Sequence, residues 1–254
     1  PDRERAELLQ AALTDPQVDV VWAARGGYGL HRILDRLDWS ALRSARPRWV
    51  VGFSDITALL LPLSAREPAW GVLHGPNVTT LPHVAAADTE HLLRILRGGP
   101  PETLSGLTTV RPGQALGPLL AGNLCLITHL LGSPYLPSAA GRVVVLEEVG
   151  EAPYRVDRML CALHLAGWLD GAAGVVLGEL RGCQAAGVDA GAVTSELLKR
   201  WLPASVPIAA GAPVGHGERC APLREGAPYR LLASANGAEL APLSALGPAR
   251  PAPT

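Results

Sequence analysis

The feature that most constrains the fold is the alternation of helical and strand-like segments over the first 97 residues. Helical patterns reach Leu13 and restart at Leu30 and Ile56, and apolar runs that suit buried strands lie at 18–24, 49–53 and 70–73. A last helical stretch covers 89–96. This alternation predicts βαβ units, and therefore a mostly parallel sheet with helices on its faces. We predict an α/β fold whose ligands gather at the carboxyl ends of the strands.

A second domain is predicted after a segment rich in Gly and Pro. Gly98 to Pro101 and the polar run up to Gly113 are typical of a linker, so we predict domains at 1–106 and 107–246. Residues 247–254 are rich in Pro and Ala and are expected to be a disordered tail. In the second domain we predict helices at 119–131, 153–166 and 193–201, strands at 143–146, 175–177 and 208–210, and a terminal hairpin at 229–240.

Composition excludes several classes of partner. The chain of 254 residues has a formal net charge of -1 and no long basic block, which argues against nucleic acid and favours a small molecule or neutral peptide. The longest apolar stretch, 119–131, is too short to cross a bilayer. The 4 cysteines are far apart and form no Cys-x-x-Cys pair, so neither a disulfide framework nor a metal site is predicted. We therefore expect a cytoplasmic protein.

Ser54 lies where an apolar run gives way to a helical segment. Gly52 supplies backbone freedom for a sharp turn, and a serine on such a turn projects its hydroxyl away from the sheet. This is where an α/β enzyme places a nucleophile. The alternative is that Ser54 caps the following helix, and the local sequence does not choose between the two.

A serine nucleophile needs a base and a carboxylate that orients it. Glu147 and Glu148 directly follow the apolar run 143–146, and His216 stands in a loop between two glycines. The alternative for the carboxylates is a solvated strand end. His74, which also ends a predicted strand, is the rival candidate for the base, although we prefer His216.

The segment 24–29, Ala-Arg-Gly-Gly-Tyr-Gly, follows a predicted strand and opens a helix. Its glycine spacing does not match a phosphate-binding loop. Backbone N–H groups at Gly26 and Gly27 could instead stabilise the oxyanion of a tetrahedral intermediate, or the segment could simply be a tight turn.

Together these segments resemble the LD-carboxypeptidase family of serine peptidases, which includes murein tetrapeptide carboxypeptidases and microcin C immunity peptidases. The matching segments occur in family order at 24–29, 52–58, 74–76, 122–124, 146–148, 153–160 and 213–217. The resemblance covers nearly the whole chain. It implies a Rossmann-like N-terminal domain with the nucleophile and a C-terminal α/β domain with the Glu and the His, commonly in a homodimer.

The resemblance also assigns roles to residues. It implies Ser54 as nucleophile, Glu147 as the carboxylate and His216 as general base, with the N–H groups of Asp55 and Gly27 as the oxyanion hole. Arg25, Tyr28 and Arg155 become candidates for binding the substrate, whose free carboxylate needs an Arg or backbone donors. Glu148 stands where the family usually has Asp, and it is the alternative to Glu147 as the carboxylate.

The implied reaction is release of a terminal D-amino acid from an L,D-peptide bond, as in trimming D-Ala from the murein tetrapeptide during cell-wall recycling, without a cofactor. Family members have a further opening segment before the helix with which this chain starts, so we expect that the fragment could fold poorly or be inactive.

Three alternatives remain. An immunity peptidase that cuts a peptide-nucleotide antibiotic has the same chemistry. A non-catalytic binding protein of the same fold is a second alternative. A general α/β-hydrolase is disfavoured because Ile56 stands where its serine elbow requires Gly.

Overall fold

The computed structural model describes residues 1–185 and 187–243, so the predicted tail at 247–254 lies outside the described residues. The helices are α1 (Asp2–Thr14), α2 (Trp39–Ser44), α3 (Thr57–Arg66), α4 (Ala86–Leu96), α5 (Leu124–His129), α6 (Pro153–Leu165) and α7 (Ala190–Trp201). Three short 3-10 helices are η1 (Leu30–Arg36), η2 (Ser54–Ile56) and η3 (Val78–His83). Among these described helices, none has the length and apolar character needed to cross a membrane.

The strands form two main sheets. Those of the first half are β1 (Val20–Trp22), β2 (Trp49–Gly52), β3 (Gly71–His74), β4 (Leu104–Arg111) and β5 (Gly113–Asn123). Those of the second half are β6 (Val143–Val149), β7 (Gly174–Arg181), β8 (Gln184–Ala185), β9 (Val188–Asp189), β10 (Ile208–Ala210), β11 (Leu223–Arg224), β12 (Pro228–Ser234) and β13 (Gly237–Pro242).

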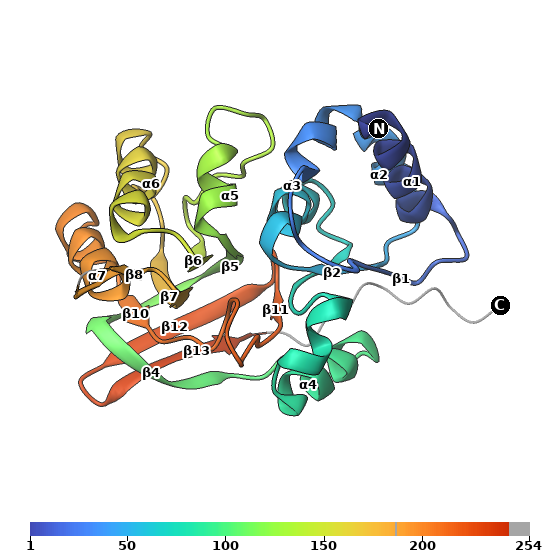
Figure 1. The fold of residues 1–254 in the computed structure, drawn as a ribbon. Helices are drawn as coiled ribbons and strands as arrows, with labels where there is room; N and C mark the ends of the chain where they lie inside the picture. The colour runs from blue at the N-terminus through green and yellow to red at the C-terminus, as the bar shows by residue number, and fades with distance from the viewer. Residues whose placement is uncertain (186, 244–254) are drawn as a thin grey trace.

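The N-terminal lobe is a four-stranded sheet between two layers of helices (Figure 1). Strands β1, β2 and β3 are parallel, and β11 joins β3 in the antiparallel sense from far along the chain. Successive side chains of a strand point to opposite faces. Val50 and Val72 accordingly belong to the core shared with α3, whereas Val51 and Leu73 pack with Leu92 of α4.

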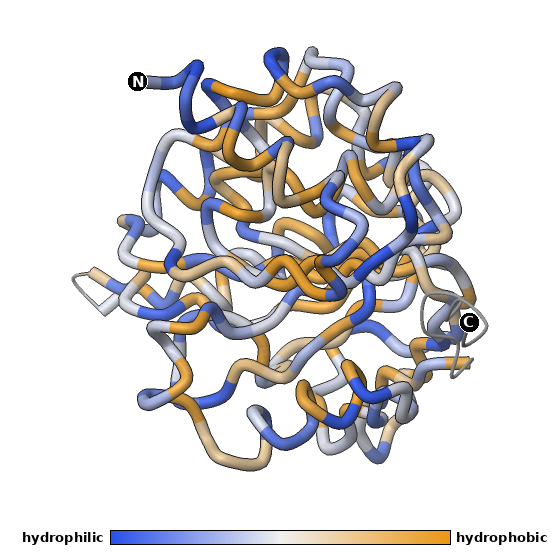
Figure 2. The backbone as a smooth tube through the Cα atoms, turned by 90° about the vertical axis from the view of Figure 1, so that its right-hand side faces the viewer, coloured by the Kyte–Doolittle hydropathy of each residue, from blue (hydrophilic) through white to orange (hydrophobic). Residues whose placement is uncertain are grey.

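The C-terminal lobe is a closed seven-stranded barrel in the order β10-β4-β13-β12-β5-β6-β7. Its four parallel neighbours are β5, β6, β7 and β10, and helices α5, α6 and α7 cover them on the outside (Figure 1). Val143 and Val145 point into the barrel, whereas Val144 and Leu146 pack against the helices. Both faces of these strands are buried, which explains the unbroken apolar run in the sequence. Figure 2 shows the same pattern, with hydrophobic segments through the centre and hydrophilic segments at many outer turns.

The α/β class predicted from the sequence is confirmed, but two segments were predicted wrongly. Residues 119–123 belong to β5 rather than to a helix, and only 124–129 are helical. The predicted linker at 98–113 contains β4, because Leu104 and Leu107 are buried inside the barrel. A boundary between residues 106 and 107 would therefore divide a strand, and the exact domain limits stay a prediction.

The two lobes are joined through Glu225, which directly follows β11. Both oxygens of its buried carboxyl group accept from the N–H of Ala121 in the barrel, at 3.0 and 3.1 Å. Its own N–H donates to the carbonyl of Val72 in the N-terminal sheet. Burial raises the pKa of Glu225 well above its ordinary value. This buried carboxyl group thus ties β5 to β3 where the lobes meet.

Candidate active site

Ser54 lies on a sharp turn between β2 and η2. Its φ of 64° makes it the single non-glycine residue with a positive φ among the described residues. This left-handed conformation is uncommon for residues other than glycine and marks a site that the surroundings must hold in place. The turn is tight, since a Cβ at Gly52 would lie 2.7 Å from Cγ2 of Ile56. The predicted elbow is therefore present.

Asn77 holds the backbone just before the nucleophile. Its buried side chain accepts from the N–H of Phe53 at 3.3 Å and faces the Phe53 carbonyl at 3.5 Å. The N–H of Gly75 also donates to the carbonyl of Gly52 at 2.9 Å. Sequence reasoning missed Asn77. Its position directly after Gly75-Pro76, at the end of a predicted strand, was the available signal.

The glycine turn after β1 lies directly against the nucleophile. A Cβ at Gly26 would lie 2.9 Å from Cβ and 3.1 Å from Oγ of Ser54. Gly27 has a φ of 120°, which favours glycine. The carboxylate of Asp55 accepts from the N–H of Leu30 at 3.1 Å and so fixes the far end of this turn. The structure thus brings together Ser54 and both predicted oxyanion-hole residues, Asp55 and Gly27, although their roles as donors stay a prediction.

His216 and Glu147 form a hydrogen-bonded pair. Nδ1 of His216 lies 2.7 Å from Oε2 of Glu147, whose side chain is fully buried at the end of the apolar part of β6. The loop that carries the imidazole requires glycine, because Gly215 has a φ of 134° and a Cβ there would meet Glu147 Oε2 at 3.1 Å. This pairing orients the ring and leaves Nε2 for a second partner.

The imidazole of His216 packs on the residue that precedes the nucleophile. The ring centroids of His216 and Phe53 are 4.7 Å apart, and the rings are inclined at 47°. Phe53 is covalently joined to Ser54. This contact therefore brings the Glu147–His216 pair, carried by the barrel, to the elbow carried by the N-terminal sheet.

Glu148 has a different environment from Glu147. Its carboxylate accepts from Asn123 Nδ2 at 3.0 Å, from the N–H of Cys125 at 2.8 Å and from its own neighbour Val149 N–H at 2.8 Å. Burial raises the pKa of Glu148. The donors on Asn123 and Cys125 tie β6 to the start of α5, and the carboxylate that contacts His216 is Glu147.

His74, the rival candidate for the base, is fully buried at the end of β3. Burial lowers the pKa of its imidazole to about 4. Within the described residues, neither of its ring nitrogens has a hydrogen-bond partner. The ring instead packs against the edge of Phe53, with centroids 6.1 Å apart. His74 therefore supports the site by packing against Phe53, the residue before the proposed nucleophile.

A cavity of about 440 Å³ adjoins the elbow between η1 and α5. Its lining includes Gly27 and Asp55 from the oxyanion segments, Tyr28 with 82% of its surface exposed, and Cys125 and His129 of α5. Burial raises the pKa of the Cys125 thiol to about 11, so this thiol is protonated at neutral pH and is a poor nucleophile.

The two predicted substrate-binding arginines differ in placement. Arg25 is exposed beside the glycine turn, with Nη2 3.6 Å from the Cβ position of Gly27. Arg155, in contrast, lies on α6 and pairs with Glu151 at 3.3 Å. The structure brings Arg25 and Tyr28 to the elbow, while Arg155 is paired with Glu151 in the segment before α6.

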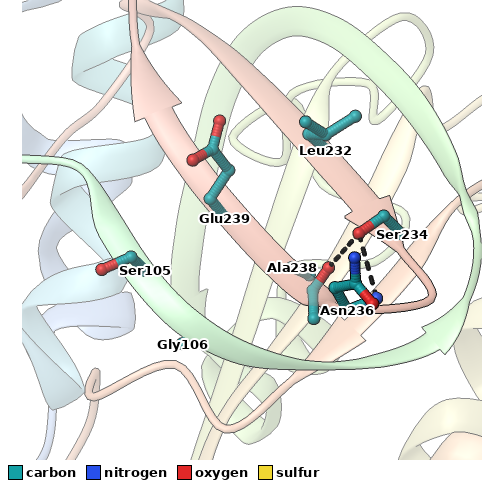
Figure 3. Close-up of a pocket in the computed structure, with 8 residues that line it drawn as sticks. Ser105, Gly106, Leu232, Ser234, Asn236, Ala238 and Glu239 are labelled. Atoms are coloured by element: carbon teal, nitrogen blue, oxygen red, sulfur yellow. Dashed lines mark hydrogen bonds between the residues drawn. The ribbon is translucent and has the colours of Figure 1, made fainter.

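A smaller hollow of about 220 Å³ lies on the barrel (Figure 3). Its lining comes from β4 and the β12–β13 hairpin, where Ser234 Oγ donates to the Gly237 carbonyl at 3.1 Å and accepts from the Asn236 N–H. None of its lining residues is a predicted site residue. The chemistry-bearing side chains gather at the elbow instead.

Comparisons with known proteins identify the same two halves. Residues 1–75 match the LD-carboxypeptidase N-terminal domain, and residues 116–231 match the LD-carboxypeptidase C-terminal domain. A protein of Streptomyces coelicolor described as a carboxypeptidase is 45% identical over 72% of this chain and 60% of its own length. A "probable murein peptide carboxypeptidase" of Bacillus subtilis is 31% identical over 87% of this chain and 70% of its own length. The chain thus spans 60% to 70% of the length of these relatives.

Solved structures show the same fold. The muramoyltetrapeptide carboxypeptidase of Oxalobacter formigenes superposes with a TM-score of 0.84 at 29% identity and covers 95% of this chain and 83% of that one. The protein MccF in complex with glutamyl sulfamoyl guanosine gives a TM-score of 0.82 at 19% identity over 97% and 82% of the two chains, which is a likeness of fold alone. The matches confirm the family predicted from the sequence: this chain belongs to the LD-carboxypeptidase family, whose members are serine-type carboxypeptidases.

Proposed function

We propose that this protein is a serine carboxypeptidase that cleaves an L,D-peptide bond and releases terminal D-Ala from the murein tetrapeptide in cell-wall recycling. The single observation that carries the proposal is the 2.7 Å Glu147–His216 pair packed on Phe53, next to a serine held at a φ of 64°. The relatives named for murein peptides support the choice of substrate.

In the proposed mechanism, Nε2 of His216 accepts the proton of the Ser54 hydroxyl as Oγ attacks the carbonyl carbon of the scissile bond. The buried carboxylate of Glu147 stabilises the imidazolium that forms and holds the ring in one tautomer. The imidazolium then gives its proton to the leaving amino group of D-Ala. Water attacks the acyl-enzyme by the same route and restores Ser54.

The negative oxygen of each tetrahedral intermediate needs preorganised donors. The N–H groups of Asp55 and Gly27 are the proposed pair, because Gly26 packs on Ser54 and Asp55 fixes the end of the same turn. The adjoining cavity, lined by Tyr28 and Asp55, is proposed to hold the peptide. Arg25 is the better candidate for the substrate carboxylate, because Arg155 is already paired with Glu151.

Replacement of the nucleophile tests the proposal. We expect Ser54→Ala to lower the rate of D-Ala release from murein tetrapeptide by at least about 1,000-fold, with little change in thermal stability. Ser105→Ala, an exposed serine on β4, is the matched control and should keep the wild-type rate. Wild-type turnover by the Ser54 variant would exclude the assignment. A parallel assay on a peptide-nucleotide distinguishes the immunity-peptidase alternative.

We also propose that the protein acts in the cytoplasm as a homodimer. The four unpaired thiols support a reducing compartment. The homodimer is proposed from the resemblance to the LD-carboxypeptidase family alone. Sedimentation equilibrium of the full-length protein would show a monomer if the dimer proposal is wrong.

A further inference from the structure

The loop that carries His216 is held by both lobes. It runs from β10 in the barrel to β11 in the N-terminal sheet. On the barrel side, Glu147 accepts from His216, and the carboxylate of Glu179 on β7 packs so closely on Gly217 that a Cβ there would lie 1.8 Å from Oε2. These contacts fix one end of the loop to the barrel.

Asp88, in the first turn of α4, holds the other end of the loop. Its Oδ2 accepts from Nε of Arg219 and its Oδ1 accepts from Nη2, both at 2.8 Å. Oδ2 also accepts from the N–H of Cys220 at 2.8 Å. Directly before α4, the N–H of Ala85 donates to the carbonyl of Glu218 at 2.8 Å. Four hydrogen bonds therefore join α4 to residues 218–220.

The Asp88 clamp, formed by Asp88, Arg219 and the Cys220 N–H, combines a buried carboxylate with a half-exposed arginine. The side chain of Asp88 is 2% exposed, and a carboxylate is rarely buried to this extent unless it is fully paired. A two-pronged arginine contact fixes direction as well as distance. The acidic group also lies in the first turn of its helix, where the helix dipole favours negative charge. The clamp is thus a rigid connection, and only two residues along the chain separate its arginine from His216.

We propose that Asp88 is a positioning residue for the reaction: through Arg219 and the Cys220 N–H, it aligns the loop that carries His216 with the lobe that carries Ser54. The inference rests on the proposed function, because it takes His216 as the general base. The base and the nucleophile belong to different lobes, and a displacement of about 1 Å between reacting groups can cost on the order of a hundredfold in rate. The Asp88 clamp ties the base to the nucleophile's own lobe, which the Glu147 contact alone does not do.

The test compares Asp88→Asn and Arg219→Gln with wild type. Each removes the two-pronged contact, and Arg219 has 48% of its side chain exposed, so its variant is expected to fold even where Asp88→Asn does not. We expect kcat for D-Ala release to fall about tenfold to a hundredfold in folded protein, with KM within about threefold of wild type.

The double variant should be no worse than the more impaired single variant, because both substitutions remove the same contact. Arg219→Lys, which keeps the charge but not the fork, should recover part of the rate.

Glu102→Gln is the matched control. It breaks an ion pair to Arg94 on the same helix without a hydrogen bond to the His216 loop, and kcat should stay at the wild-type value. The proposal is overturned if folded Arg219→Gln keeps the wild-type kcat, or if its rate falls only in proportion to the unfolded fraction seen by circular dichroism.

Failure of the proposed substrate gives a different result. If wild type does not release D-Ala, the rate of Ser54 modification by a fluorophosphonate replaces turnover as the readout for the same variants. An unchanged modification rate in Arg219→Gln would then refute the clamp, whereas a tenfold to hundredfold slower rate would support it without the tetrapeptide.

Discussion

His74 carries an uncharged imidazole at neutral pH, because burial lowers its pKa to about 4. The nearby Glu147 carboxylate opposes this shift, and the neighbouring His216 adds to it. A neutral ring beneath Phe53 fills space at the site without adding a second positive charge. At the scale of single residues, this separates the two candidate bases, since His216 has a carboxylate partner and His74 has none among the described residues.

The buried imidazole predicts a loss of stability in acid. Below pH 6.5 the unfolded chain binds a proton at His74, whereas the folded chain does so only near pH 4, so stability falls as the pH drops through this window. Between pH 7 and pH 5 we expect wild type to lose about 2 kcal/mol of unfolding free energy relative to His74→Gln. Urea unfolding of both proteins across this range measures the difference. If the free energy of unfolding changes equally with pH in the two proteins, the expectation is contradicted.

The residues of the site could be predicted from the sequence only where their surroundings are local. Ser54 and His216 stand in glycine-containing turns that the sequence displays directly. Glu147 and Glu148 are neighbours, and what separates them is a contact with a loop 69 residues away. Asn77 and Asp88 were not predicted at all, because their partners come from other elements and no local pattern marks them.

The elbow between β2 and η2 depends on the absence of a side chain at Gly52. A Cβ there would lie 2.7 Å from Cγ2 and 2.9 Å from Cβ of Ile56, so Gly52→Ala must push η2 away from the strand. We expect this overpacking to lower the free energy of unfolding by about 1–3 kcal/mol and to reduce turnover, since η2 begins with Ser54.

Gly75→Ala is the control for this prediction. Gly75 directly follows the neighbouring strand β3, and a Cβ there would meet nothing closer than 3.4 Å. Urea unfolding should place this variant within about 0.5 kcal/mol of wild type. Equal stability of the two alanine variants would show that the elbow is not sterically constrained.

At the scale of elements, the sequence pattern predicted the three parallel strands of the N-terminal sheet and most helices, but it missed β11 and failed at β4 and β5. Residues 119–131 read as one apolar helix because a strand buried on both faces shows no alternation, and the helix that follows is also apolar. β4 was hidden for the opposite reason. Several of its residues are exposed, and its polar sequence with flanking Gly and Pro resembles a linker.

At the scale of the whole molecule, the site exists only where two lobes meet. The nucleophile and the proposed oxyanion donors come from the N-terminal sheet, and the Glu147–His216 pair comes from the barrel and its exit loop. Glu225 and the Asp88 clamp cross the same junction. No separate segment of the sequence could have displayed this arrangement, because it arises from the return of β11 to the first sheet.

Mass-spectrometric mapping of a fluorophosphonate adduct tests the central claim most directly, because this reagent reports an activated serine whatever the natural substrate is. We predict a single adduct on Ser54, no adduct in Ser54→Ala, and labelling slowed by at least about a hundredfold in His216→Ala. An adduct on another residue, or labelling of the His216 variant at the wild-type rate, would contradict the account.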